Sequence, residues 1–245
     1  EDKYRTLVEQ SLQGTWVIQD MRVVFCNQTF ANMGGWTVDE VYSFSPEEVT
    51  NIIHPDDQKR VWGRFRERLE GKQLPLTNNQ LRAFRKDGSI AWIEYDARRI
   101  NFSGRPAMLI SVLDITERRE AEKALRESEQ RYRQLAESAP EFIFIIDKEG
   151  KVRYVNSSGA REFGCDPDQM LGKSVMELFL PETAKRQWEN IQKVIQSGQA
   201  LLNSETKVIF PTREVWLNTS LVPLRAESSE VIQVLGIARD VTERK

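Results

Sequence analysis

The side chains best suited to covalent or metal chemistry are few in this sequence. Its 245 residues contain two cysteines, Cys26 and Cys165, and one histidine, His54. This set excludes a disulfide framework and a zinc cage of histidines and cysteines built by this chain alone. The sequence also lacks a glycine-rich phosphate loop and a serine, histidine and aspartate set within reach. We therefore expect no catalytic centre and no metal site, and we predict that this chain is not an enzyme by itself.

A short acidic string occurs twice, and its spacing predicts a local structural role. The string comprises Asp114, Thr116 and Glu117 in its first occurrence and Asp240, Thr242 and Glu243 in its second. The aspartate can accept hydrogen bonds from the first turn of a following helix, and the glutamate three residues later can reach back, as in a capping box. Such a cap stabilises a helix by about 0.5–2 kcal/mol and fixes the angle at which it leaves the preceding strand.

A charged stretch, residues 117–137, follows the first string and contains neither glycine nor proline. It is predicted to form one continuous helix with a thin apolar seam at heptad spacing: Ala121, Leu125, Ser128, Tyr132 and Leu135. Two interpretations remain open. The helix is a solvated connector, or it communicates between two domains and pairs with a second copy in a homodimer.

The sequence before this helix is repeated after it. Residues 15–27 and 143–156 each predict a β-hairpin that ends at an asparagine, and short helical stretches follow. A longer helix is expected to begin at Pro55 and again near Pro181. Three strands then complete each copy, at residues 76–85, 89–102 and 106–115 and at residues 202–210, 213–224 and 230–241. We expect a domain at residues 1–116, the connector at 117–138 and a second domain at 139–245.

Composition excludes several other classes of protein. The net charge of −2 provides no basic field for nucleic acid, and no run approaches the ~20 apolar residues of a membrane span. The first residues do not resemble a signal peptide. We therefore expect a cytoplasmic protein that contacts neither nucleic acid nor membrane through this part of the chain.

Both copies resemble PAS domains, and the resemblance covers nearly the whole chain. Three features carry it in both copies: the asparagine after the hairpin (Asn27 and Asn156), the string at 35–40 and 164–169, and the acidic string that begins at Asp114 and Asp240. Two more occur in the first copy, namely His54-Pro55-Asp56-Asp57 and the stretch 85–92. The resemblance implies an α+β fold in which each domain is a five-stranded antiparallel sheet of order 2-1-5-4-3. Helices on one face of the sheet would enclose a small pocket. It also implies a sensory module that relays the state of the pocket, through the duplicated string and the connector helix, to an output domain in the same protein. A histidine kinase or a cyclase would be such an output.

Aromatic side chains are the candidates for the pocket wall, although aromatics serve as core in most proteins. Those expected around the two pockets are Trp16, Phe25, Phe30, Trp36, Trp62 and Phe65 in the first copy and Phe144, Tyr154, Phe163, Phe179 and Trp188 in the second. Groups that would orient a small-molecule ligand are Asn78, Asn79 and Gln80, and in the second copy Asn218 and Ser220. Which of these faces inward stays open, since a shift of one residue flips a strand.

Three functions remain open at this stage. The first is a small-molecule sensor, and the second is a ligand-free dimerisation scaffold whose pockets are filled by side chains. The third is a redox or gas sensor that holds noncovalent flavin or haem. His54 precedes Pro55 at a helix start, where the family has a structural His-Pro, so capping is favoured over haem ligation. Neither cysteine lies in the string that the covalent flavin photosensors of the family carry. We expect no cofactor, with noncovalent flavin as the alternative.

Overall fold

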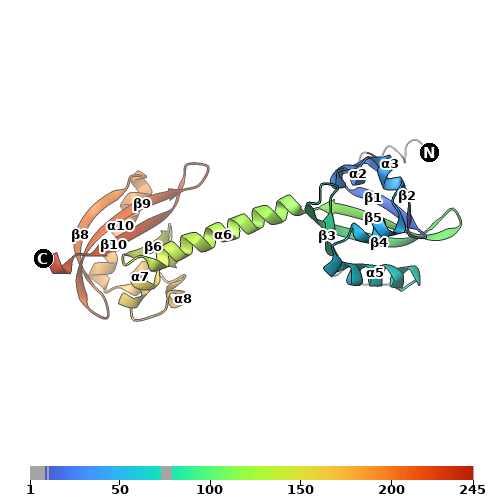
Figure 1. The fold of residues 1–245 in the computed structure, drawn as a ribbon. Coiled ribbons are helices and arrows are strands. Elements are labelled where there is room, and N and C mark those ends of the chain that lie inside the picture. Colours follow the sequence, from blue (N-terminus) through green and yellow to red (C-terminus); the bar gives the residue numbers. More distant parts are fainter. Residues whose placement is uncertain (1–8, 10, 73–78, 245) are drawn as a thin grey trace. The chain divides into compact units, whose positions relative to one another are not determined.

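The computed structural model describes Glu9, residues 11–72 and residues 79–244. The chain divides into two compact units, Glu1–Arg126 and Glu127–Lys245, and the division falls within helix α6, Thr116–Ser138. Each unit repeats the same order of elements, many of which are labelled in Figure 1. The domain limits that the sequence predicts stay a prediction.

Five antiparallel strands form the sheet of the first unit, in the order β2-β1-β5-β4-β3. They are β1 (Gly14–Gln19), β2 (Arg22–Cys26), β3 (Gln80–Phe84), β4 (Ile90–Phe102) and β5 (Arg105–Asp114). This is the order that the resemblance implies. Residues 76–78, which were expected to begin the third strand, lie outside the described residues.

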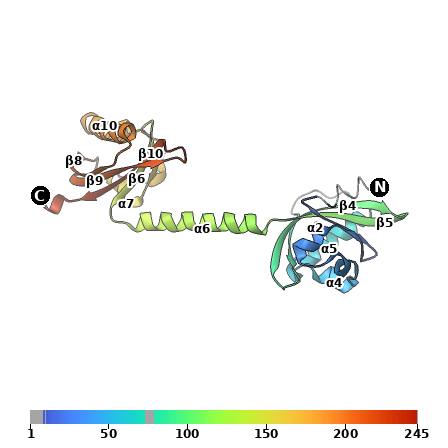
Figure 2. The same cartoon turned by 90° about the horizontal axis from the view of Figure 1, so that it is seen from above.

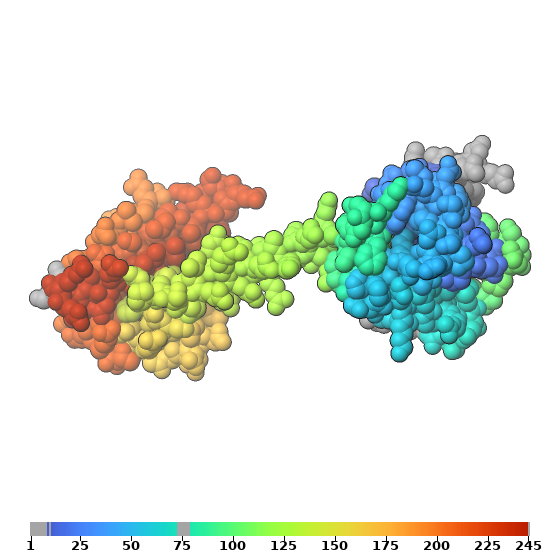
Figure 3. Space-filling model, viewed as in Figure 1, coloured from blue at the N-terminus to red at the C-terminus, as the bar shows by residue number. Residues whose placement is uncertain are grey.

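Helices α2 (Gln28–Gly34), α3 (Val38–Tyr42), α4 (Pro46–Asn51) and α5 (Pro55–Leu69) follow β2. Figure 2 shows α2, α4 and α5 on one side of strands β4 and β5. In the space-filling view, the segment from α2 to α5 covers much of the visible face of this unit (Figure 3). Gly35 ends α2 in the left-handed conformation, with φ 75°, and Thr37 then caps α3 through a capping box.

The second unit repeats this architecture with the sheet order β7-β6-β10-β9-β8. Its strands are β6 (Phe142–Asp147), β7 (Val152–Val155), β8 (Leu201–Ile209), β9 (Glu214–Arg225) and β10 (Val231–Asp240). Its helices are α7 (Ser157–Glu162), α8 (Pro167–Met170), α9 (Val175–Leu178) and α10 (Pro181–Ser197), and η1 (Thr242–Arg244) is a 3₁₀ turn after β10. Helix α10 packs against β8, β9 and β10.

A buried asparagine joins the hairpin to the first helix in each unit. Asn27 Oδ1 accepts from the amide of Thr15 at 2.8 Å and from the amide of Phe30 at 3.0 Å, which caps α2. Asn156 Oδ1 accepts in the same way from Ile143 at 3.1 Å and from Gly159 at 2.9 Å. Because both side chains are fully buried, their polar atoms need these partners.

The two cores are organised differently. In the first unit one continuous cluster of buried side chains runs from β1 and β5 to α5. The second unit has two clusters, and Phe144, Phe163 and Phe179 pack against both. Phe144 lies across the strand pair from Gly236, and a Cβ atom at Gly236 would overlap its ring. The glycine therefore provides the space that this aromatic ring occupies.

Helix α6 buries none of its residues. Along its seam the side chains of Leu125, Tyr132 and Leu135 are 62%, 70% and 61% exposed. Within the described residues, we find no helix with the length and apolar content needed to span a bilayer.

Candidate functional site

A cavity of about 80 Å³ lies in the core of the first unit, between the sheet and helices α2 and α5. Five of the aromatic residues that the sequence nominates line it: Trp16, Phe30, Trp36, Trp62 and Phe65. Trp16 stacks on Phe30 with their ring centroids 4.5 Å apart, and Trp62 meets Phe65 edge to face at 5.2 Å. These rings form a rigid apolar wall around the cavity.

Phe25 was expected at this wall, and that expectation is wrong. Phe25 pairs with Val17, whereas the neighbouring residues Trp16 and Ile18 belong to the core cluster. Because successive residues of a strand face opposite sides, Phe25 points to the other face of the sheet. The register shift between Val17 and Ile18 explains the error, because it changes which residues of β2 face inward.

Sequence reasoning missed several residues that line the first cavity, and two of them are deeply buried and polar. Tyr95 lies on β4 and Arg68 lies on α5, and they are only 6% and 7% exposed. Tyr95 follows the alternation of Ala91 and Ile93, so its inward position was readable from the sequence. Arg68 continues the helical stripe that contains Phe65, but a basic residue at an apolar position is a weak signal by itself.

The second unit has a cavity of about 70 Å³ at the equivalent place. Phe144, Phe163 and Phe179 line it, as the sequence predicts. They are the three rings that pack against both core clusters, so the cavity lies where the divided core meets. Its polar lining residues are Gln187 and Thr219.

Three residues expected at the second cavity lie elsewhere. Tyr154 donates its hydroxyl to Glu137 Oε1 at 3.0 Å, and the ring of Trp188 packs against Gly150. Asn218 faces a shallow groove on the opposite side of the sheet, together with Ser220. The alternation of buried Leu217 with half-buried Asn218 along β9 fixes this orientation and turns Thr219 inward. Thr219 is therefore the polar residue of β9 at the cavity, next in sequence to the candidate Asn218.

A chain of hydrogen bonds connects the first cavity to the start of α6. Arg85, which lines the cavity, donates from Nε to the carbonyl of Met33 at 3.1 Å and from Nη2 to Asp114 Oδ2 at 2.6 Å. Asp114 Oδ1 accepts from the amide and the hydroxyl of Thr116 at 2.9 and 2.5 Å. The hydroxyl also accepts from the amide of Trp92 at 2.9 Å. We call this group of five residues the first joint.

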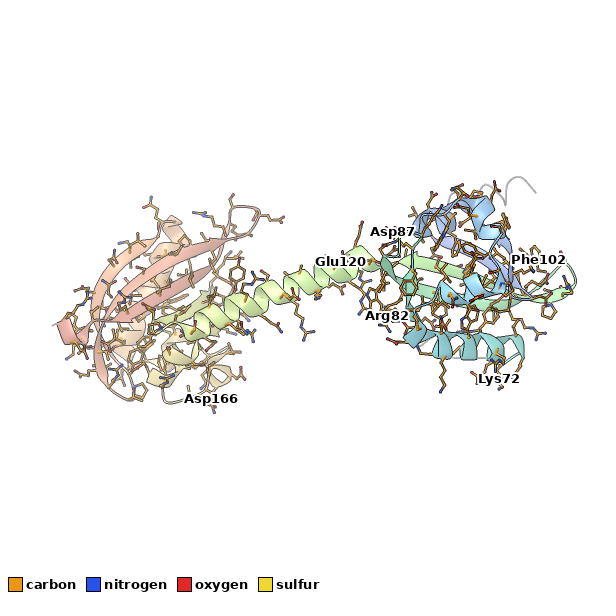
Figure 4. All side chains as sticks on the ribbon, viewed as in Figure 1. Lys72, Arg82, Asp87, Phe102, Glu120 and Asp166 are labelled. Carbon is orange, nitrogen blue, oxygen red and sulfur yellow. The ribbon has the colours of Figure 1, made fainter. Side chains whose placement is uncertain are left out.

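The surroundings of the first joint add a second link to α6. Arg119, in the second turn of the helix, places its guanidinium 3.7 Å from the ring centroid of Trp92 and donates to Gln80 Oε1 at 3.0 Å. Figure 4 shows Glu120 of α6 and Asp87 of the β3–β4 turn at the same end of the unit, opposite Phe102. The start of α6 is therefore attached to the sheet edge formed by β3 and β4.

The second unit contains an equivalent group, which we call the second joint. Arg213 donates from Nε and Nη2 to both carboxylate oxygens of Glu162, the last residue of α7, at 2.8 Å each. Its Nη1 lies 3.0 Å from Asp240 Oδ2. Asp240 Oδ1 accepts from the amide and hydroxyl of Thr242 at 2.9 and 2.6 Å, and that hydroxyl accepts from Trp216 at 2.9 Å.

Both aspartates are held in the ionised form. Burial raises the pKa of Asp114, but hydrogen bonds from Thr116 and Arg85 outweigh burial and lower the pKa below its ordinary value of 3.8. The pKa of Asp240 is lowered in the same way, with burial opposed by Thr242 and Arg213. The carboxylate of Glu162 in turn raises the pKa of Arg213. All three groups are therefore charged at neutral pH.

The caps differ from the predicted capping box. Each aspartate accepts from the residue two positions later, Thr116 or Thr242. Glu117 and Glu243 are exposed, and neither side chain contributes a hydrogen bond among the described residues. The threonine hydroxyl provides the second contact instead, because it bonds to both the aspartate and the tryptophan of the neighbouring strand.

His54 and the cysteines have structural surroundings. His54 is the N-cap of α5, where Nδ1 accepts from the amide of Asp56 at 3.3 Å, and its ring stacks on Phe84. Burial, followed by the charge of Glu9, raises the pKa of the Cys26 thiol to about 11, and Cys165 is half-buried. In the described part of the chain, no three His, Cys, Asp or Glu residues are grouped to hold a metal ion.

The cavities do not fit a flavin or a haem as they stand. An engineered apolar cavity of about 150 Å³ holds one benzene molecule. Cavities of about 80 and 70 Å³ are smaller, so a three-ring isoalloxazine or a porphyrin would require the walls to move. His54 is not among the described residues that line the first cavity.

Comparison with known proteins gives a consistent picture. Residues 23–113 and residues 136–245 match two family models that are both described as a PAS fold. Sporulation kinase A of Bacillus subtilis is 24% identical over 249 residues, which cover 100% of this chain and 39% of that protein. The two-component sensor PprA of Pseudomonas aeruginosa is 27% identical over 194 residues, which cover 78% of this chain and 20% of that protein.

Among solved structures, the PAS domain of Bordetella pertussis BvgS is similar at a TM-score of 0.40 and 25% identity. The match covers 50% of this chain and 92% of that one. This chain spans well under half the length of the two sensor proteins named above.

Proposed function

Because the chain belongs to the PAS-fold family in both of its repeats, we propose that it is the sensory part of a signal-transduction protein. Its relatives include a sporulation kinase and a two-component sensor, and the chain matches only part of each. We propose further that the whole protein carries an output domain, as a histidine kinase does, and that the pockets of this chain regulate it from the cytoplasm. The chain itself detects and relays, and it catalyses nothing.

One observation carries this proposal: Arg85 belongs both to the wall of the first cavity and to the first joint. A small molecule that enters the cavity changes the position of its walls. Any displacement of Arg85 weakens its 2.6 Å hydrogen bond to Asp114, the residue that holds the first turn of α6 through Thr116. Occupancy of the cavity is thereby converted into a change at the start of the connector helix.

The relay is tested by replacing Asp114 with alanine. The first turn of α6 loses a cap worth about 0.5–2 kcal/mol, so its amides should exchange with solvent roughly 2- to 30-fold faster. Hydrogen exchange with mass spectrometry, on peptides that cover residues 114–124, measures this change, while peptides from β1, β4 and β5 should exchange as in the unchanged protein.

The matched control is Glu120→Ala, which removes an exposed carboxylate from the same helix. Its exchange should equal that of the unchanged protein. If Asp114→Ala also leaves the start of α6 unchanged, the joint does not control the helix and the relay fails.

A second function, dimerisation, is favoured by the exposed seam of α6. Leu125, Tyr132 and Leu135 lie at heptad spacing on a helix with no buried residue. We propose that this seam pairs with the same seam of a second copy. Sedimentation velocity should give a dimer that Leu125→Asp with Leu135→Asp converts to a monomer. A monomer at all concentrations before substitution would exclude this function for α6.

A further inference from the structure

The wall of the first cavity includes a buried cation, Arg68, and no described residue of that wall is acidic. Arg68 is 7% exposed, and its Nη2 atom has no hydrogen-bond partner among the described residues. The other charged residue of the described lining, Arg85, is paired with Asp114. No aspartate or glutamate is among the described residues that line the cavity. Because a buried charge without a partner is strongly unfavourable, this arrangement requires an explanation.

Three more buried polar atoms of the same wall have no hydrogen-bond partner in the part of the chain that the structure describes. They are the indole Nε1 of Trp16, the indole Nε1 of Trp62 and the hydroxyl of Tyr95. An indole nitrogen can only donate a hydrogen bond, and a guanidinium can only donate as well. The cavity therefore offers donors and positive charge, and it is complementary to a group that accepts hydrogen bonds and carries negative charge.

Ordered water and the dipole of helix α5 are two simpler explanations for the buried Arg68, and neither is sufficient. Ordered water would satisfy the indoles and the hydroxyl, but it brings no negative charge to Arg68. The carbonyl end of α5 favours a cation in its last turn, which contains both Arg66 and Arg68, but the exposed Arg66 makes this contribution without being buried. Neither explanation requires Arg68 to be buried against the cavity.

We infer that the first cavity binds a short-chain monocarboxylate, whose carboxylate group lies against Arg68 and accepts from Trp16 and Trp62. A carboxylate is planar and matches the guanidinium fork. The remaining wall is aromatic and aliphatic, including Phe30 and Ile93, and it suits an apolar tail. The volume of about 80 Å³ limits that tail to a few carbon atoms. This inference rests on the proposed sensory function and specifies the class of its signal.

The second cavity acts as an internal control. Its described lining includes Gln187 and Thr219 but no charged residue, and none of its lining atoms is among the buried unpartnered groups. The buried residues of α10 are Thr183, Ala184, Ile191 and Val194. A carboxylate has no cation to meet there, so acid binding should be confined to the first unit.

The test is a titration of the whole chain with propionate, followed by nuclear magnetic resonance of the indole N–H signals. The signals of Trp16 and Trp62 should shift and saturate, whereas those of Trp188 and Trp216 should not move. Propionamide and propylamine, which have the same size but no negative charge, should bind at least about tenfold more weakly, since hydrogen bonds to charged groups are the stronger ones.

Substitutions separate the role of Arg68 from a role in folding. Arg68→Met should weaken propionate binding at least about tenfold, and Arg66→Met, the matched exposed control, should not change it. Arg68→Met should also keep or raise the melting temperature without ligand, because a buried unpaired charge is replaced by an apolar side chain of similar length.

Several outcomes would overturn the inference. They are failure of propionate to shift the Trp16 and Trp62 signals, equal binding of propionamide, and unchanged binding by Arg68→Met. A clear fall in melting temperature on Arg68→Met would also overturn it, because that result assigns Arg68 a structural role. The Asp114→Ala exchange experiment uses no ligand, so the relay can stand even if the carboxylate site fails.

Discussion

The two units of this chain have the same fold but unlike cavities. Among the described residues, the first cavity is lined by two arginines and by buried donors without partners, whereas the polar residues that line the second are Gln187 and Thr219. The strands and their order are the same in both units. The duplication has therefore kept the scaffold and changed the chemistry of the interior, and under the proposed sensory function the two copies are expected to bind different molecules.

The joints differ in a second way. Arg85 connects one carboxylate, Asp114, with a backbone carbonyl, whereas Arg213 connects two carboxylates, Glu162 and Asp240. The stability of the first joint thus depends on the position of Arg85 at the cavity wall. The stability of the second joint depends mainly on the attraction between one guanidinium and two carboxylates. This contrast predicts that salt and acid affect the second joint more than the first.

The largest effect is expected at the paired buried asparagines. Asn27→Ala and Asn156→Ala should each lower the free energy of unfolding of their own unit by about 2–5 kcal/mol, because several buried backbone groups lose their partners. Asn156 also donates to the carbonyl of Ala136, in the last turn of α6, at 2.9 Å. Hydrogen exchange should therefore show a loosened end of α6 for Asn156→Ala alone.

The exposed residue Asn101 on β4 provides the control, since Asn101→Ala should change stability by less than about 0.5 kcal/mol. Equal effects of Asn27→Ala and Asn156→Ala on the end of α6 would show that the asparagine does not hold this turn.

A smaller effect is expected at the joints. Arg213→Met should destabilise the second unit by about 1–2 kcal/mol, because it leaves two carboxylates facing each other in a half-exposed site. Arg85→Met should destabilise the first unit by about 1 kcal/mol, since a single carboxylate loses its partner. Chemical denaturation at 0.05 M and 0.5 M salt measures both. A greater salt dependence of the first unit would contradict the contrast.

The smallest effect concerns acid. Asp147, in the second hairpin, accepts from the amide of Lys151 at 2.8 Å and from Arg153 at 2.6 Å. Burial raises the pKa of Asp147, but these bonds outweigh it and lower the pKa below 3.8. A lowered folded-state pKa contributes stability above the ordinary pKa, and that stability is lost as the pH falls through the folded-state value.

Asp147→Asn should therefore destabilise the second unit by about 1 kcal/mol at pH 7 and by progressively less below about pH 4. Asp20, in the first hairpin, is exposed and serves as the control, so Asp20→Asn should change stability at pH 7 by less than about 0.5 kcal/mol. Thermal melts between pH 2.5 and 7 distinguish the two. A constant effect of Asp147→Asn over this range would exclude the ionised form as the cause.

Much of the scaffold was readable from the sequence. The hairpins and the antiparallel sheets follow from local spacing and turn chemistry, and the structure confirms them. The strand order was correct through the family resemblance. Local patterns succeed here because each of these features depends on residues that are close in the chain.

The cavities were only partly readable. A strand shows two faces but not which one is covered, so the sequence named Asn218 as a candidate and left its direction open, and the structure places Thr219 at the cavity instead. A bulge of one residue was enough to misplace Phe25. Arg68 was missed for a different reason. Whether a charged side chain is buried depends on the tertiary structure, and the pattern of a single sequence does not predict it.

The contact between Arg119 and Trp92 gives the molecule an optical property. An indole changes the intensity and wavelength of its fluorescence when a neighbouring charge moves, and the guanidinium of Arg119 lies 3.7 Å from this ring. Arg119 belongs to the second turn of α6, and Trp92 belongs to the sheet. Trp92 is therefore a built-in fluorophore for the first joint, and a chain in which the other five tryptophans are phenylalanine would emit from this position alone.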